Sequence, residues 1–236
     1  MSNEQAKEMV GENLTLEQAQ DVVEEYAPSD YFRDTYRAWE SRYLPHICAV
    51  VENDEPGVAL DIGPGWGTMV SWLASRGYLV GVLDNAPQGK FISEQLCQAL
   101  ALRYYQSSIE AAVIPTGFYD LVLMTQVLTH LKWRPDAAMR QVAKALAPGG
   151  TAIISVTDAE QYDYGEVPYS HWTDVPTVDS GAEALPNETI CTYTEHIFED
   201  LLRTAFTNVR ITKPEGAQTL IAECHQRGVN DDSANG

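Results

Sequence analysis

Short apolar runs alternate with amphipathic segments along the middle of the chain. The pattern predicts strands at 58–62, 79–83, 103–106, 119–124 and 151–156, and helices after residue 67, over 87–102 and over 134–146. Two more strands, at 209–212 and 219–223, are expected to form a closing hairpin. Strands that alternate with helices form an α/β fold around a mostly parallel sheet. We therefore expect a doubly wound, mostly parallel sheet of seven strands.

Two helices are expected before the first strand. Thr15 and Gln18 have the spacing of a capping box, which predicts a helix that ends near Tyr26. A second helix is expected from Asp30 and should end at Pro45, because proline disrupts a helix interior. Four aromatic residues would lie on one face of it: Phe32, Tyr36, Trp39 and Tyr43. This face either packs against the sheet domain or forms a lid over a ligand crevice.

The segment 159–190 lacks clear periodicity, and a loop of this length inside a compact domain is usually functional or disordered. Its aromatic residues argue against disorder. They are Tyr162, Tyr164, Tyr169, His171 and Trp172. The segment is either half of a substrate cap or a surface loop whose rings pack on the domain. Beyond it, Thr192 and Glu195 have the spacing of a second capping box and predict a last helix.

Charge and composition exclude several classes of partner. The 236 residues carry 34 Asp and Glu against 15 Lys and Arg, a formal charge of −19 that repels phosphate backbones and anionic lipids. Nucleic acid and membrane are therefore not expected as partners, and the acidity serves solubility or attracts a cationic substrate. The four cysteines and five histidines are scattered, so we expect reduced thiols and no metal site. The polar N-terminus lacks a signal-peptide core, which favours the cytoplasm.

The stretch after the first predicted strand has the richest chemistry. Asp61 ends the apolar run, and Gly63, Gly65 and Gly67 follow at every second position. Glycine permits positive φ and lets a ligand approach the backbone closely, and the start of the next helix offers unpaired N–H groups. A dinucleotide site would have the spacing G-x-G-x-x-G, which this stretch lacks. Asp84 ends the second strand, where it could accept hydrogen bonds from both hydroxyls of a ribose.

Four ordered segments together resemble the class I S-adenosylmethionine-dependent methyltransferases. They are Leu60–Gly67, Gly81–Asp84, Phe118–Val122 with Val127–Leu131, and Leu146–Gly150. The resemblance covers about residues 58–156 and implies a Rossmann-like methyltransferase fold. It implies S-adenosylmethionine as cofactor, S-adenosylhomocysteine as product and a small-molecule methyl acceptor, in a monomer or homodimer. Residues 1–56 would form an N-terminal helical cap, 57–225 the catalytic domain with a cap insertion at 159–190, and 226–236 a flexible tail.

The resemblance also implies roles for individual residues. Expected cofactor-binding residues are Asp61, Gly63, Pro64, Gly65, Gly67, Asp84, Asn85, Ser108, Ile109, Thr125, Gln126, Tyr31 and Arg37, with Tyr26 and Arg33 as further candidates for the cofactor carboxylate. His130 and His171 are the candidate bases, because imidazole titrates near neutral pH. Candidate substrate residues are Tyr36, Tyr164, Tyr169 and Trp172. Ser108 departs from the family, which often has an acid at that position to bind the adenine amino group.

Other functions remain open at this stage. The same glycines and acids would suit a regulatory or scaffolding protein that binds the cofactor without turnover, and the aromatic cap would also suit a peptide acceptor. An enzyme that transfers another part of the cofactor is a further alternative.

Overall fold

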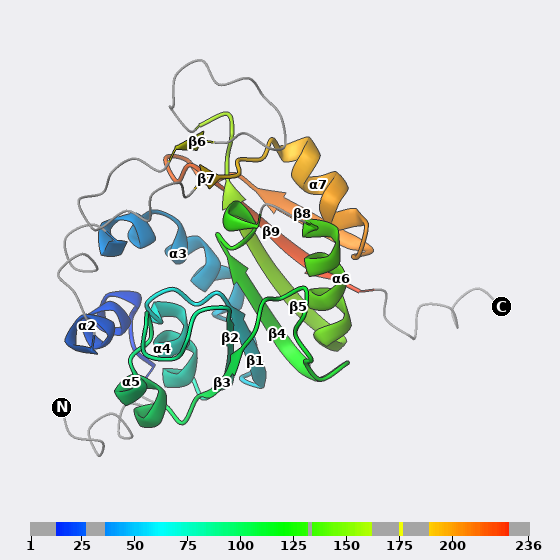
Figure 1. The fold of residues 1–236 in the computed structure, drawn as a ribbon. Coiled ribbons are helices and arrows are strands. Elements are labelled where there is room, and N and C mark those ends of the chain that lie inside the picture. Colours follow the sequence, from blue (N-terminus) through cyan, green and yellow to red (C-terminus); the bar gives the residue numbers. More distant parts are fainter. Residues whose placement is uncertain (1–12, 27–35, 132–133, 162–174, 177–188, 227–236) are drawn as a thin grey trace. The chain divides into compact units, whose positions relative to one another are not determined.

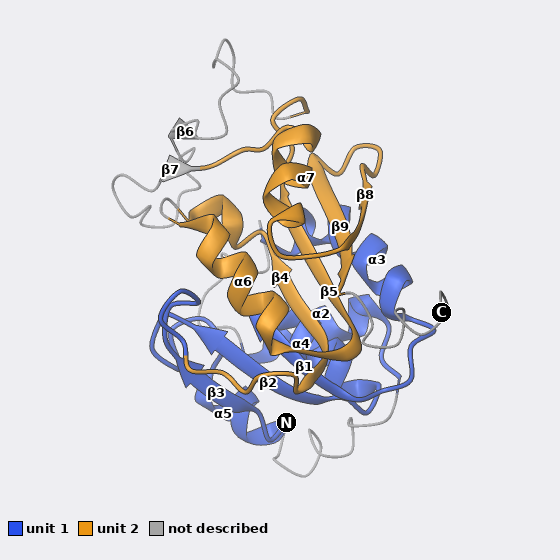
Figure 2. Ribbon diagram, turned by 90° about the vertical axis from the view of Figure 1, so that its right-hand side faces the viewer, with its two compact units in different colours: residues 1–112 blue, residues 113–236 orange. Residues whose placement is uncertain are grey.

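The structure, a computed structural model, describes residues 13–26, 36–131, 134–161, 175–176 and 189–226 (Figure 1). The chain divides into two compact units, Met1–Ala112 and Val113–Gly236 (Figure 2). The strand order is β3-β2-β1-β4-β5-β9-β8, which confirms the predicted seven-stranded, mostly parallel sheet. The division after Ala112 lies within the segment that the sequence predicts as one catalytic domain.

In the first unit the three strands are parallel. Strand β1 (Val58–Ile62) pairs with β2 (Leu79–Asp84), and β2 pairs with β3 (Arg103–Gln106). The registers place Ile62 opposite Leu83, and Asp84 opposite Gln106. The carboxyl ends of β1 and β2 therefore lie side by side, which brings the loops that follow them together.

The described residues of the first unit contain four helices: α2 (Leu16–Tyr26), α3 (Arg37–Val51), α4 (Thr68–Ser75) and α5 (Glu94–Ala99). The predicted capping box at the start of α2 is confirmed. The amide of Thr15 donates to Oε1 of Gln18 at 2.8 Å, and the amide of Gln18 donates to the Thr15 hydroxyl at 3.2 Å. Every residue of α4 is buried, because this helix packs against β1, β2 and α2.

The prediction that Pro45 ends the second helix is wrong, because α3 continues to Val51. Residues on both sides of the proline are fully buried, among them Leu44, Ile47 and Val51. Burying such side chains stabilises by about 1.5–3 kcal/mol each, which offsets the roughly 3 kcal/mol that a proline costs in a helix interior. The helix predicted over 87–102 is also shorter than expected. It begins after the N-cap Ser93, whose hydroxyl accepts from the amide of Leu96 at 3.0 Å.

In the second unit, β4 (Tyr119–Thr125) and β5 (Leu146–Thr157) are parallel. Strand β9 (Thr219–His225) is antiparallel to β5, and β8 (Asn208–Thr212) is antiparallel to β9, so the predicted closing hairpin is confirmed. The 3₁₀ helix η2 (Leu128–His130), α6 (Pro135–Ala145) and α7 (Glu195–Arg203) complete this unit. Two short strands, β6 (Val175–Pro176) and β7 (Thr189–Ile190), pair within the segment that showed no periodicity.

Two boundaries in the second unit differ from the predictions. Strand β5 begins at Leu146 rather than Thr151, so Gly149 and Gly150 lie in a strand and not in a helix-ending turn. A Cβ atom on Gly150 would lie 2.9 Å from the carbonyl oxygen of Tyr119, so the close pairing of β4 and β5 requires glycine there. The last helix is capped by Thr194 rather than Thr192, and its hydroxyl accepts from the amide of Ile197 at 3.5 Å.

All four cysteines are free thiols, and three of them are buried. Within the described part of the chain, no helix is both long and apolar enough to cross a bilayer.

Candidate cofactor site

The loop between β1 and α4 follows the predicted backbone course. Gly63, Gly65 and Gly67 have φ angles of 62°, 56° and 99°, a region that residues with a Cβ atom rarely adopt. The amide of Gly63 donates to the carbonyl of Leu83 at 2.8 Å, and that of Gly67 donates to the carbonyl of Pro64 at 3.0 Å. The loop is thus tied to the end of β2 and turns directly into the N-terminus of α4.

Tyr36 lies against this loop from the start of α3. A Cβ atom on Gly65 would lie only 2.5 Å from the Tyr36 hydroxyl oxygen. The Tyr36 ring also contacts Trp66 of the loop, with ring centroids 6.4 Å apart. The aromatic face predicted on this helix is therefore in contact with the glycine-rich loop, and Gly65 leaves the space in which the hydroxyl lies.

Asp61 at the end of β1 is 1 % exposed, and its Oδ1 atom is buried without a hydrogen-bond partner. Burial raises the pKa of Asp61 to about 8, and the negative charges of Asp84 and Glu40 raise it further in the same direction. A buried carboxyl with no protein donor is costly unless a ligand, ion or proton satisfies it. This atom marks a place where a donor or a cation would bind.

Glu40 of α3 is a second buried acid of this unit. Its Oε2 accepts from the hydroxyl of Thr68 at 2.7 Å and from the side-chain Nε2 of Gln20 at 3.5 Å. Burial raises the pKa of Glu40 to about 7, although both hydrogen bonds lower it. Because Thr68 is the first residue of α4, Glu40 links α2 and α3 to the end of the glycine-rich loop.

Asp84 at the end of β2 is half-buried and held by the backbone. Its Oδ1 accepts from the amide of Ala86 at 2.7 Å. Burial raises the pKa of Asp84, while the amide of Ala86 and the charge of Lys90 act in the opposite direction. The hydroxyl of Tyr104 donates to the carbonyl of Ala86, which fixes this turn further. The carboxylate is therefore preorganised at the end of a strand next to β1.

The turn after β3 contains the remaining residues of unit 1 that the sequence analysis singled out. The amide of Ser107 donates to the carbonyl of Asp84 at 2.9 Å, so the start of this turn lies beside Asp84. Ile109 is buried and Ser108 is half-buried. Asn85, by contrast, is exposed.

In the second unit, Gln126 belongs to a buried polar network. Its Nε2 donates to the hydroxyls of Ser155 and Thr219, each at 3.4 Å, and its Oε1 accepts from Thr129 and Thr157 at 3.3 and 3.0 Å. The side chain is 4 % exposed and its φ is 61°. These hydrogen bonds use the amide group inside the protein, so this geometry does not favour the predicted cofactor contact.

His130 and Thr125 lie on either side of this network. Thr125 ends β4 and is half-buried, whereas His130 is exposed at the end of η2. The amide of Cys191 donates to the carbonyl of Thr129 at 2.6 Å, which ties η2 to the chain before α7. The candidate base is therefore on a turn that is fixed at several points.

Arg37 is engaged elsewhere in unit 1. Its guanidinium forms ion pairs with Asp21 and Glu24 of α2, both at 2.7 Å. This arrangement fastens α3 to α2 and does not favour the predicted role in binding a cofactor carboxylate. Six predicted site residues lie outside the described residues: Tyr31, Arg33, Tyr164, Tyr169, His171 and Trp172.

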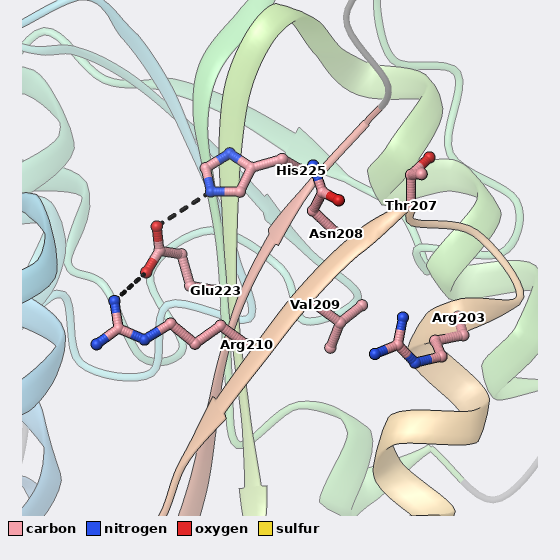
Figure 3. Close-up of a pocket in the computed structure, with 7 residues that line it drawn as sticks. All are labelled: Arg203, Thr207, Asn208, Val209, Arg210, Glu223 and His225. Atoms are coloured by element: carbon pink, nitrogen blue, oxygen red, sulfur yellow. Dashed lines mark hydrogen bonds and ion pairs between the residues drawn. The ribbon is translucent and has the colours of Figure 1, made fainter.

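A cavity of about 300 Å³ in the second unit is lined by other residues, namely Arg203, Thr207, Asn208, Val209, Arg210, Glu223 and His225 (Figure 3). In Figure 3, Arg210 and His225 both point toward Glu223, which pairs with them at 3.7 and 3.0 Å. His225 is in register with Thr151 in the amino-terminal half of β5, whereas ligands in parallel sheets bind at the carboxyl ends. The cavity and its paired charges therefore do not form part of the candidate site.

Glu40 and Thr68 are site residues that the sequence analysis missed. A signal was present, because Glu40 lies one helical turn after Tyr36 and three residues before Tyr43, on the predicted aromatic face. An acid on a buried helix face needs a partner or a proton.

A comparison with family models matches residues 31–210 to a methyltransferase domain. This match spans most of the chain and includes the glycine-rich loop, Asp61 and Asp84. The chain belongs to this methyltransferase family. As a methyltransferase of class I, it uses S-adenosylmethionine as its cofactor. No curated protein sequence matches the chain.

Solved structures share the methyltransferase fold at low sequence identity. A protein from Pyrococcus horikoshii has a TM-score of 0.61 and 14% identity, with 84% of this chain and 99% of that chain covered. The 1,6-didemethyltoxoflavin-N1-methyltransferase of Burkholderia thailandensis, solved with 1,6-didemethyltoxoflavin and S-adenosylhomocysteine bound, has a TM-score of 0.60 and 16% identity, with 89% and 87% covered. An S-adenosylmethionine-dependent methyltransferase of Mesorhizobium loti has a TM-score of 0.56 and 18% identity, with 78% and 98% covered.

Unit 1 of this methyltransferase fits a nucleoside that carries an amino-acid tail. The backbone of the glycine-rich loop adopts positive φ at Gly63, Gly65 and Gly67, and the buried Oδ1 of Asp61 has no donor in the protein. Asp84 is held at the end of the neighbouring strand, where its oxygens could accept hydrogen bonds from the hydroxyls of a ribose. These features agree with the cofactor of the family.

Proposed function

We propose that the glycine-rich loop of unit 1 holds S-adenosylmethionine. In this assignment the backbone of 63–67 approaches the amino-acid tail, Asp61 faces its ammonium group, and Asp84 accepts hydrogen bonds from the ribose hydroxyls. Ser108 and Ile109 follow β3 beside Asp84 and would contact the adenine. The unpartnered Oδ1 of Asp61 supports this assignment, because a cationic group would satisfy it. When bound, the cofactor supplies an activated methyl group on a sulfonium.

The acceptor that we propose is a small, partly apolar or aromatic molecule, methylated on O, N or C. The observation that carries this proposal is a continuous series of aromatic rings beside the loop. Ring centroids lie 5.8 Å apart for Phe91 and Trp66, 6.4 Å for Trp66 and Tyr36, and 5.3 Å for Tyr36 and Trp39. Trp39 continues to Tyr43 at 4.8 Å. Such faces bind apolar rings and cations through stacking and cation–π contacts.

The protein's own contribution to the reaction would be orientation, exclusion of water and removal of a proton where the acceptor needs it. Orientation alone is worth about 7–11 kcal/mol of barrier, whereas a general base adds about 10²–10⁴-fold. We propose His130 as the base, because it is exposed at the end of η2 on a turn that Thr129 anchors to Gln126. Loss of the imidazole would therefore leave measurable turnover.

The acceptor class can be tested with a panel of phenols, aromatic amines, carboxylates and short peptides. Formation of S-adenosylhomocysteine would be measured for each compound, on protein freed of co-purified ligand. We expect turnover with at least one aromatic compound, and a Trp39→Leu variant should raise its KM while the affinity for S-adenosylhomocysteine stays unchanged. Turnover on peptides alone would contradict the proposal, as would a Trp39→Leu variant with unchanged KM.

A further inference from the structure

Glu40 is a buried acid whose role the cofactor assignment leaves unexplained. It is 3 % exposed and comes from the helical segment before the first strand. Its two donors, Thr68 and Gln20, are both uncharged. Two neutral donors stabilise a buried carboxyl without neutralising it, so the protein must hold either a proton or an uncompensated charge at Glu40.

Asp61 is also a buried acid, and its Oδ1 atom has no hydrogen-bond donor in the protein. It is fully buried, and the charges that act on it are those of Glu40 and Asp84, which are both negative. Like charges that share a low-dielectric site cannot all ionise, so one or more of them retains a proton. The hydrogen bond from Thr68 holds Glu40 at the end of the glycine-rich loop that follows Asp61, and the negative charge of Glu40 raises the pKa of Asp61. The protonation of Asp61 therefore depends on that of Glu40.

The charged groups on the elements around this pair give it little compensation. On α2 and α3, Arg37 is already paired with Asp21 and Glu24. On β2, Asp84 adds negative charge, and the charge of Lys90 acts on Asp84. On α4, Thr68 contributes only its hydroxyl. A ligand that brings a positive charge to this place would supply what the protein does not.

We propose that Glu40 and Asp61 form a proton-exchanging pair, which releases a proton to solvent when the ammonium group of the cofactor's amino-acid tail binds. Glu40 is the positioning residue of the pair. The negative charge of Glu40 raises the pKa of Asp61. The hydrogen bond from Thr68 connects Glu40 to the first residue of α4. This inference rests on the proposed cofactor site. Among the described residues, no group of acids, histidines and cysteines is arranged to hold a metal ion instead.

The direction in which affinity changes with pH follows from the protonation of Glu40 and Asp61 before and after the ammonium group binds. Burial raises the pKa of Glu40 to about 7 and that of Asp61 to about 8, so the pair retains a proton near neutral pH. A bound ammonium favours the charged carboxylates and lowers both pKa values. Affinity should therefore rise with pH between 6 and 8, by up to about tenfold per pH unit for each proton released.

Calorimetry can measure this proton directly. S-adenosylhomocysteine would be titrated into the full-length protein at pH 7 in buffers that differ in ionisation enthalpy, so that the number of protons released is the slope of the observed heat. The matched ligand is 5′-methylthioadenosine, which has the nucleoside and the thioether but no ammonium or carboxylate. We expect proton release with the first ligand and none with the second.

Variants then assign the proton to the pair. Asp61→Asn and Glu40→Gln should each reduce the release. Glu40→Gln should also move the pH midpoint of binding downward, because Asp61 would lose a negative neighbour. Glu215→Gln is the matched control, since it removes one negative charge at an exposed site and leaves Glu40, Asp61 and Thr68 unaltered, so proton release should persist. Circular dichroism would show which variants are folded, and the comparison of the two ligands needs no variant.

Equal proton release with both ligands would overturn the inference, as would a Glu40→Gln variant that releases as many protons as the unaltered protein. Binding of S-adenosylhomocysteine with the same affinity at pH 6 and pH 8 would overturn it while leaving the cofactor site intact. If neither nucleoside binds at any pH, the proposed cofactor site fails, and the inference fails with it.

Discussion

The hydroxyl of Tyr36 lies 2.5 Å from the point at which a Cβ atom on Gly65 would be placed. Gly65 also has a φ of 56°, so any other residue there meets both backbone strain and a steric clash. The clash involves the first turn of the helical segment before β1. A change at Gly65 therefore disturbs both the loop and the aromatic series that we associate with the acceptor.

We expect Gly65→Ala to weaken binding of S-adenosylhomocysteine by at least about tenfold, or about 1.4 kcal/mol, because the strained φ and the clash with Tyr36 distort the loop backbone. Titration calorimetry would measure the change. Gly77→Ala is the control, since Gly77 has a φ of +89° but a Cβ atom there would meet only Pro56 at 3.8 Å. The control should lose stability and keep its affinity. Equal affinity in both variants would exclude the loop as the cofactor site.

Asp84 offers a test of the ribose contact in which the turn is preserved. Asparagine can still accept the hydrogen bond from the amide of Ala86, so Asp84→Asn should remain folded. It loses charge-assisted hydrogen bonds to the ribose, which are worth about 1.5–3 kcal/mol, so we expect affinity to fall about tenfold or more. Calorimetry with adenosine would isolate the nucleoside part. An Asp84→Asn variant that binds adenosine as tightly as the unaltered protein would place the ribose elsewhere.

The strand positions were predictable because apolar runs and turn residues specify them locally. The three residues of the glycine spacing all adopt positive φ, as their residue type indicates. The prediction that the helix ends at Pro45 was wrong because the burial of Leu44 and Ile47 outweighs the low helix propensity of proline. Tertiary contacts of this kind are invisible to a pattern along the sequence.

The site was predictable only where backbone geometry defines it. Arg37 and Gln126 were predicted to bind the cofactor because of their side-chain groups. In the structure, Arg37 forms an ion pair with Asp21, and Gln126 accepts a hydrogen bond from Thr157. Glu40 was missed because its partners come from α2 and α4, which are far from it in sequence. Which polar group binds which partner depends on the fold.

The buried network around Gln126 should stabilise the second unit. Gln126→Ala removes four hydrogen bonds and leaves hydroxyls of Thr129 and Thr157 without this acceptor, so we expect a loss of about 2–3 kcal/mol in the free energy of unfolding. Gln126→Gly removes the same side chain but suits the φ of 61°, so it should be about 1 kcal/mol less destabilising. Urea unfolding would compare the two variants. Loss of less than about 0.5 kcal/mol in both would show that the network contributes little.

The pKa of Asp61 makes stability depend on pH in a direction opposite to that of most carboxyl groups. Because burial raises this pKa from 3.8 to about 8, the folded protein binds more protons than the unfolded chain between these values. The stability contributed by Asp61 is therefore complete below pH 3.8 and is lost as pH rises through 8. Asp61→Asn carries no such proton. Between pH 5 and pH 9 its free energy of unfolding should therefore rise relative to that of the unaltered protein by at least about 1 kcal/mol. At this chain length, that gain corresponds to about 2–4 °C in Tm.

Thermal unfolding across this pH range would test the prediction, with Glu215→Gln as a control for the loss of one negative charge at an exposed site. The informative quantity is the change with pH and not the absolute Tm, since asparagine differs from a neutral carboxyl in its hydrogen bonding. A difference between Asp61→Asn and the unaltered protein that stays constant from pH 5 to pH 9 would mean that Asp61 does not hold its proton. In that case the carboxylate is charged when buried, and a cation or donor from the protein must lie closer to it than the structure shows.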